Sequence, residues 1–170
     1  FVGNSRAITI SGEWGAGNAG TVSPNGFDLE FALSSGQTGT LLTSFKARKI
    51  TVTSGNLSVV AQRLAPDQGS ATNSDMTVDA GATVTSSQTG TGSSAVIGRA
   101  ATGIGGVLTV NGTLILNGVA PTIAMTTINF NGTVQYGGGV SQTLVVATNV
   151  GAATPNVYTN VTISNSVGAN

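Results

Sequence analysis

The chain has 170 residues, of which 39% are hydrophobic and 7% are charged, and its six basic and six acidic side chains give a net charge of zero. This length fits one domain with a sizeable core, while the neutral charge provides no basic surface for nucleic acid. Cysteine and histidine are absent, which excludes disulfides and removes the commonest general base and metal ligand, so we expect no enzyme activity, no metal and no cofactor.

Residues 1–45 contain most of the aromatic side chains, including the only tryptophan, Trp14. Within this segment FDLEFAL, at 27–33, alternates large apolar residues with Asp28 and Glu30, which is typical of a half-exposed strand. The end of a stacked sheet is an unpaired edge above an open core, and an aromatic-rich segment can cover it or bind a partner there. We therefore expect residues 1–45 to form an N-terminal cap or interface segment and residues 46–170 to form the rest of one structural domain.

Several short segments place a threonine between two apolar residues: ITI at 8–10, ITV at 50–52 and VTI at 161–163. This alternation indicates short strands with one buried face. The cluster KARK precedes the second of them, and its Lys46 and Arg48 fall on one face, where a solvated or aggregation-resistant strand explains them better than an anion site. The longest apolar runs are far too short to span a bilayer, so we expect no membrane insertion.

One phrase occurs twice further along the chain, as LTVNGTLIL at 108–116 and INFNGTVQY at 128–136, and a weaker copy, MTVDAGATV, lies at 76–84. Asn111 and Asn131 are 20 residues apart. An Asn-Gly pair between alternating apolar segments is also typical of a type I′ hairpin, which would give a plain antiparallel sheet. Adjacent hairpins have no reason to keep a constant offset, whereas a stacked coil must return to the same corner on each turn.

The constant offset therefore predicts an all-β solenoid in which residues 108–116 stack in parallel on residues 128–136. Its structural corners are expected at Asn111, Gly112, Asn131 and Gly132. Asparagine adopts the left-handed conformation more easily than most residues, and asparagines that repeat from one coil to the next can form a hydrogen-bonded ladder. The phrase would then recur because one coil lies on the next.

Four segments carry a resemblance to a known group: TVDAGATVTSS, GGVLTVNGTLILNG, INFNGTVQYGGGVSQTL and VYTNVTISNS. They resemble the repetitive β-solenoid regions of large secreted bacterial surface proteins, especially those of the Bacteroidota, and more loosely the filamentous-haemagglutinin-like adhesins. The resemblance covers about residues 75 to 170. It implies a right-handed parallel β-helix, export from the cell, and a structural or adhesive role without catalytic residues.

Two close carboxylate pairs could in principle serve glycoside chemistry, Asp28 with Glu30 and Asp75 with Asp79. The first pair lies on one face of a strand, where solvated acidic residues are the usual finding, and Asp79 occupies the corner equivalent to Asn111. Neither pair is therefore expected to form an active site.

Threonine columns on a flat solenoid face could match an ice lattice. Thr109, Thr113 and Thr133 do not form a clean Thr-x-Thr array along the chain, so the sequence does not predict ice binding.

Together these features predict an extracellular structural protein, a subunit or segment of a cell-surface fibre or adhesin. The alternative is a carbohydrate-binding surface module without catalysis. The expected partners are copies of the same chain or neighbouring solenoid segments, with surface polysaccharide as a further partner and nucleic acid excluded.

The two ends of the chain predict how such copies join. RAITISGEW, at 6–14, has the same apolar-Thr-apolar form as residues 161–165, so the N-terminal segment of one subunit could complete the last strand of the next and give a head-to-tail filament. The other possibility is that the chain is a fragment of a longer protein. The candidate interface residues are Phe1, Ile8, Ile10, Trp14, Val161 and Ile163.

Overall fold

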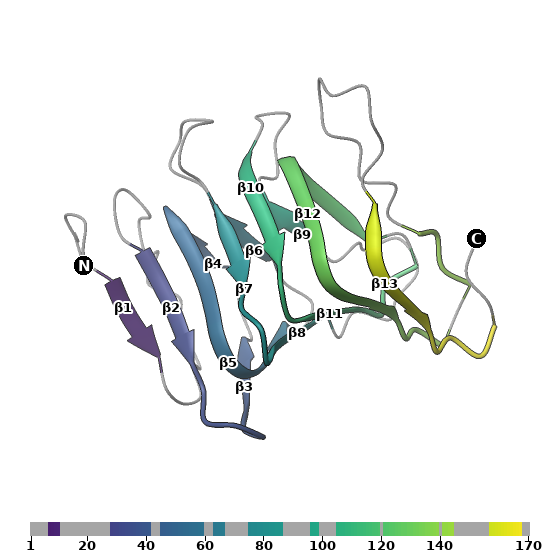
Figure 1. Ribbon diagram of the computed structural model, residues 1–170, viewed down its shortest axis with the longest axis horizontal. Helices are drawn as coiled ribbons and strands as arrows, with labels where there is room; N and C mark the ends of the chain where they lie inside the picture. The colour runs from purple at the N-terminus through teal and green to yellow at the C-terminus, as the bar shows by residue number, and fades with distance from the viewer. Residues whose placement is uncertain are drawn as a thin grey trace.

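The computed structural model describes residues 7–10, 28–41, 45–59, 63–66, 75–86, 96–98, 105–119, 121–139, 141–144 and 157–167. Within these ranges the chain forms a 13-stranded sheet and no helix (Figure 1). The strands are β1 (Ala7–Ile10), β2 (Asp28–Ala32), β3 (Thr38–Leu41), β4 (Phe45–Ala47), β5 (Lys49–Val59), β6 (Arg63–Pro66), β7 (Met76–Val78), β8 (Ala82–Ser86), β9 (Val96–Gly98), β10 (Gly105–Val110), β11 (Thr113–Leu116), β12 (Thr122–Tyr136) and β13 (Tyr158–Ile163). The described residues include no helix that is long and apolar enough to cross a membrane.

Every strand pair in the described part of the chain is parallel. The predicted stacking of residues 108–116 on 128–136 is confirmed, because Leu108 pairs with Ile128 and Leu114 with Val134. The antiparallel hairpin is therefore wrong for these segments. The identical alternation of the two copies explains their register, since a shift by one residue would turn every apolar side chain outward.

The core consists of apolar side chains that follow one another in register from strand to strand. One such column contains Leu29, Ile50, Met76, Leu108 and Ile128, and the next contains Phe31, Val52, Val78, Val110 and Phe130. None of these ten side chains is more than 3% exposed. Full burial of one such side chain stabilises a fold by about 1.5 to 3 kcal/mol, so these columns are the main stabilising feature of the described structure.

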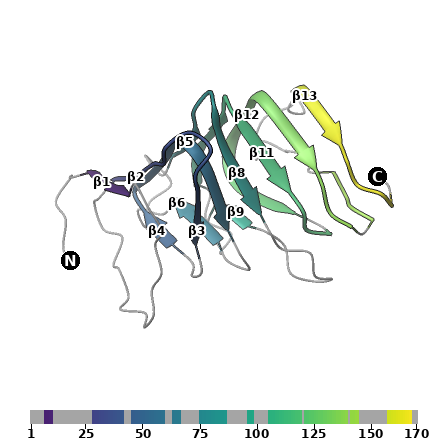
Figure 2. The ribbon, with the colours of Figure 1, turned by 90° about the horizontal axis from the view of Figure 1, so that it is seen from below.

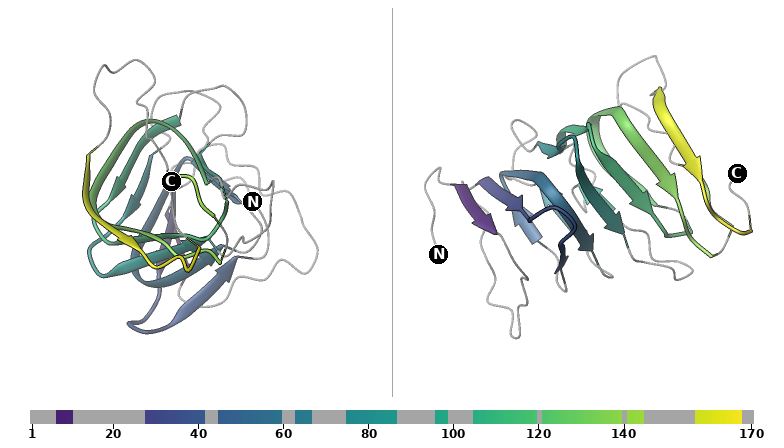
Figure 3. Two further views of the ribbon diagram at one scale, coloured as in Figure 1. Left: turned by 90° about the vertical axis from the view of Figure 1, so that its right-hand side faces the viewer. Right: turned by 60° about the horizontal axis from the view of Figure 1, so that its bottom comes forward.

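The predicted fold class, a right-handed parallel β-helix, is wrong: the sheet closes into a barrel of six parallel strands with three extra strands. The order β5-β7-β10-β12-β9-β6 leads around the core, and β6 contacts β5 again. Strands β1, β2 and β4 lie outside this circuit. Seen along the row of strands, the ribbons surround one interior (Figure 3).

The length of β12 explains why the sheet continues around the core. Its residues Thr122–Ala124 pair with β9, its middle part pairs with β10, and Thr133–Tyr136 pair with β11. The strand therefore bends without losing its backbone hydrogen bonds, and it joins two parts of the sheet that separate corners would have divided.

The predicted aromatic-rich N-terminal cap is also wrong, because the described residues form no aromatic cluster there. Phe31 belongs to the core and is 1% exposed. An aromatic contact lies at the other end of the sheet, where the rings of Phe130 and Tyr158 stack with centroids 4.8 Å apart. Phe1 and Trp14 lie outside the described residues.

Candidate functional site

Asp28, at the start of β2, forms an ion pair with Arg48. Asp28 accepts two hydrogen bonds from Arg48, with Nε–Oδ1 and Nη2–Oδ2 distances of 2.7 and 2.6 Å. This bidentate ion pair joins the start of β2 to the residue before β5, and it occupies the guanidinium of Arg48. Arg48 is therefore a structural partner of Asp28.

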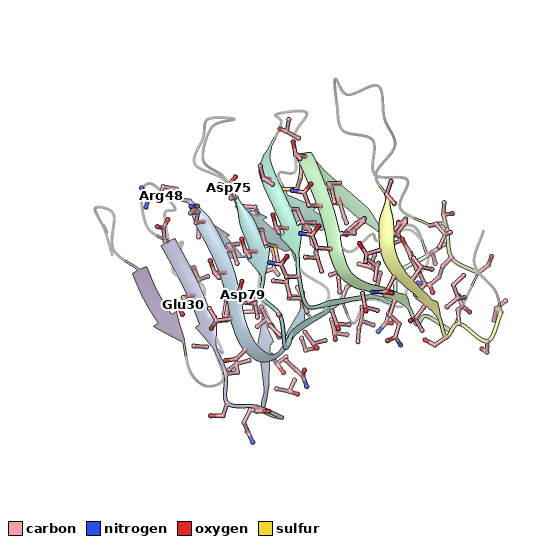
Figure 4. All side chains as sticks on the ribbon, viewed as in Figure 1. Glu30, Arg48, Asp75 and Asp79 are labelled. Atoms are coloured by element: carbon pink, nitrogen blue, oxygen red, sulfur yellow. The ribbon has the colours of Figure 1, made fainter. Side chains whose placement is uncertain are left out.

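Asp75 and Asp79 lie at opposite ends of the short strand β7 (Figure 4). The Asp75 carboxylate accepts a hydrogen bond from the backbone N–H of Val107 at 2.8 Å. Asp79 begins a tight turn in which its carbonyl accepts from Ala82 N–H and Gly81 has a φ of +87°. Both aspartates thus stabilise local backbone, and the described residues contain no group of three or more metal-ligating side chains.

The predicted corner residues lie close together in space. Asn111 and Gly112 form a bend between β10 and β11, whereas Asn131 and Gly132 belong to β12. The side-chain Nδ2 of Asn131 donates to the side-chain Oδ1 of Asn111 at 3.0 Å, so the expected hydrogen bond of an asparagine ladder is present. The left-handed conformation of these asparagines stays a prediction.

The two glycines of these phrases are where backbones approach most closely. A Cβ atom on Gly132 would overlap the carbonyl oxygen of Gly112, and a Cβ atom on Gly112 would overlap the carbonyl oxygens of Asp79 and Ala82. Glycine is therefore required at both positions by packing between strands, whatever the backbone dihedral angles are.

Gln142 is a structural residue that the sequence did not reveal. Its side chain is 1% exposed and its amide oxygen accepts from Gly138 N–H and from the Asn165 side chain, each at 2.9 Å. Its amide nitrogen donates to the carbonyls of Leu116 and Gly118, both at 2.8 Å. This one side chain ties together the segments that follow β11, β12 and β13. A lone glutamine within the polar stretch GGGVSQT gives no sequence signal for such a role.

The start of strand β13 packs against the core, whereas its later residues are exposed. At its start, Tyr158 stacks on Phe130 and its hydroxyl lies 2.9 Å from the hydroxyl of Tyr136. Burial, and then this hydrogen bond, raise the pKa of Tyr158 far above its ordinary value. Tyr158 therefore stays neutral through the physiological pH range and anchors β13 to the core.

The rest of β13 exposes apolar side chains. Val161 and Ile163 are 42% and 49% exposed, although their register partners Val134 and Tyr136 are completely buried. The large exposed hydrophobic side chains of the described residues are these two and the flanking Val157 and Val167, at 81% and 60%. The two apolar columns that lead to Val161 and Ile163 thus end uncovered at β13, the yellow strand of Figure 1.

The two groups of candidate interface residues lie at opposite edges of the sheet. Ile8 and Ile10 lie on β1, which pairs with β2 alone among the described strands, in register with Leu29 and Phe31. Through successive strand pairs, the column of Ile10 leads to Phe130 and then to Tyr158. Val161 and Ile163 end two other columns. The similar forms of residues 8–10 and 161–163 therefore do not correspond to equivalent positions in the sheet.

No protein-family model matches the chain, and no curated protein or solved structure is significantly similar to it.

Proposed function

We propose that the chain is a non-catalytic structural protein of an extracellular, cell-surface fibre, and that it joins further copies through the outer edge of β13. The observation that carries the proposal is the exposure of Val161 and Ile163 next to completely buried partners. Completing the burial of one such side chain is worth about 1 kcal/mol. Within the described residues β13 pairs with β12 only, so its other edge also offers backbone groups for a new ladder.

A second copy is the partner that fits this edge best. All described strand pairs are parallel, and the opposite edge of the sheet is the parallel strand β1. A contact between β1 of one copy and β13 of another keeps every strand parallel. Such a contact uses two different surfaces and does not close on itself, so it generates a filament rather than a dimer. In the register that continues the core columns, Ile10 of one copy would lie beside Tyr158 of the next.

Separate observations support the proposed extracellular location and the proposed non-catalytic role. Residues 75 to 170 resemble repetitive regions of secreted bacterial surface proteins, which supports an extracellular role. The two carboxylate pairs that might have formed an active site are divided between an ion pair with Arg48 and turn or backbone contacts.

Sedimentation velocity over a range of concentrations, followed by electron microscopy, tests the proposal. The full chain should form species that grow with concentration, and these should be lost in a variant with both Val161→Lys and Ile163→Lys. Thr162→Lys is the control, because it adds a positive charge to the outer face of the same strand and should assemble normally; each single variant, Val161→Lys or Ile163→Lys, adds the same charge as this control and should weaken assembly. A variant lacking residues 1–12 should also fail to assemble. A parent chain that stays monomeric at all concentrations would exclude the proposal.

A further inference from the structure

One outer face of the sheet is built from strands that follow each other side by side: β3, the second half of β5, β8, β11, the end of β12, and β13 (Figure 2). Two columns of residues run across these strands in register. The first contains Thr38, Asn56, Thr83, Thr113, Thr133 and Asn160. The second, two residues further along each strand, contains Thr40, Ser58, Thr85, Ile115, Gln135 and Thr162.

These side chains point away from the core. The residue between the two columns is buried in the successive strands, as for Leu57, Val84, Leu114 and Val134, which are at most 2% exposed. Neighbouring residues of a strand point to opposite faces, so both columns lie on the outer face. Thr113 and Thr133, which did not form an array in the sequence, are thus in register with Thr83, while Thr109 belongs to a different part of the sheet.

Strand geometry makes the two columns a two-dimensional lattice. Neighbouring strands are about 4.8 Å apart and residues two positions apart on one strand are about 6.6 Å apart. Most of the positions are threonine, whose branched side chain has few rotamers, so the lattice repeats a hydroxyl and a methyl group at regular intervals. The buried columns beneath hold these positions in place.

The side chains of the face are all uncharged, and seven of the twelve are threonine. Neither column contains a charged or an aromatic residue. Thr83, Thr85, Thr113 and Thr133 make no side-chain hydrogen bond within the part of the chain that the structure describes. Their hydroxyl groups therefore keep their donors and acceptors for water, and water bound to them must repeat with the same period.

We propose that this face binds ice. A single small ligand would need a concave site, and a sugar chain is most often held against aromatic rings, which the two columns lack. A crystal of water instead presents hydroxyl-like groups at regular intervals, and a fixed uncharged lattice of hydroxyl and methyl groups can match them over many positions at once. Each contact is weak, so the strength of binding depends on the number of positions that match. The proposal is independent of assembly through β13.

The test measures how much of the folded full chain enters slowly grown ice and how strongly it inhibits recrystallisation. Experiments are done at a concentration where sedimentation shows a monomer, so that the outcome does not depend on filament formation. The parent should be enriched in ice at least tenfold over a non-binding protein of similar size. Thr113→Lys and Thr133→Lys, at the centre of the lattice, should each reduce this enrichment to the background level.

Thr109→Lys is the matched control, because Thr109 also lies between two buried residues of a strand but outside the two columns. It should behave as the parent does. Circular dichroism and the melting midpoint establish that each variant is folded. If either Thr113→Lys or Thr133→Lys does not fold, the other variant tests the proposal. The proposal is overturned if the parent is excluded from ice, if Thr109→Lys loses binding equally, or if the face binds crystalline cellulose or chitin and not ice.

Discussion

The side chains of Asn111 and Asn131 are joined by a hydrogen bond of 3.0 Å, although 20 residues separate them in the chain. Each asparagine precedes a glycine whose backbone lies against the neighbouring strand. The repeated Asn-Gly-Thr phrase therefore has a physical purpose in this sheet: asparagine links neighbouring strands through its side chain, and glycine allows them to approach.

Removing this link should weaken the fold by a small amount. Asn131→Val introduces a residue that favours strands but loses the hydrogen bond, which for an exposed pair is worth about 1 kcal/mol of unfolding free energy. Asn129→Val is the control, since Asn129 is exposed on the same strand and its side chain forms no hydrogen bond within the part of the chain that the structure describes. Chemical denaturation of both variants measures the difference, and equal midpoints would show that the asparagine pair is not stabilising.

A methyl group at Gly132 should have a larger effect. Gly132→Ala would place Cβ against the carbonyl oxygen of Gly112, and since backbone atoms cannot move aside easily, we expect a loss of about 2 to 3 kcal/mol. Gly139 has no neighbouring atom within 4 Å of the equivalent Cβ position, so Gly139→Ala should leave the melting temperature nearly unchanged. Similar melting temperatures for the two variants would contradict the close approach of these backbones.

Replacing the buried amide of Gln142 should lower the free energy of unfolding strongly. Gln142→Leu would remove the partner of Gly138 N–H and of the Gly118 carbonyl, while the Leu116 carbonyl would keep only its hydrogen bond from Gly137 N–H. Each unsatisfied buried group costs about 1 to 3 kcal/mol, so we expect a total loss of about 3 kcal/mol. Ser141→Ala, at the exposed neighbouring residue, should have little effect on the same denaturation midpoint. Hydrogen exchange at Gly138 provides a second readout, because its amide should exchange faster in Gln142→Leu.

Substitution of Ser86, unlike that of Gln142, should increase the stability of the fold. Its side chain is 6% exposed, and its hydroxyl has no hydrogen-bond partner. It stands in register with Val59 and Leu116, in an otherwise apolar column. Ser86→Ala removes the unsatisfied hydroxyl and should stabilise the fold by about 1 kcal/mol. Thr85→Ala, which changes the outward-facing neighbour, should not stabilise it, and a destabilised Ser86→Ala would indicate that the hydroxyl is satisfied.

The raised pKa of Tyr158 predicts a loss of stability in alkaline solution. Burial, and the hydrogen bond to Tyr136, keep the native hydroxyl protonated, whereas the unfolded chain ionises near its ordinary pKa of about 10. The native state then binds more protons, so the free energy of unfolding should fall as the pH rises above about 10. Melting temperatures at pH 8 to 11, chosen to span that value, should fall less steeply in Tyr158→Phe than in the parent.

Sequence reasoning succeeded where a local pattern carries the information. The alternation in LTVNGTLIL and INFNGTVQY predicted which side chains are buried, because neighbouring residues of any strand point to opposite faces. It also predicted the parallel pairing of Leu108 with Ile128, because two identical patterns bury their apolar residues together in only one register.

The sequence by itself determined the strands, their buried faces and the pairing of the two repeated phrases. The tertiary structure alone decided that β12 would carry the sheet around the core, that Gln142 would be buried, and that Thr83, Thr113 and Thr133 would stand in one column. The physical reason is that strand alternation depends on adjacent residues, whereas sheet closure and register depend on pairings between residues 18 to 33 positions apart. The connecting segments differ in length, so no fixed spacing in the sequence identifies which threonines will meet.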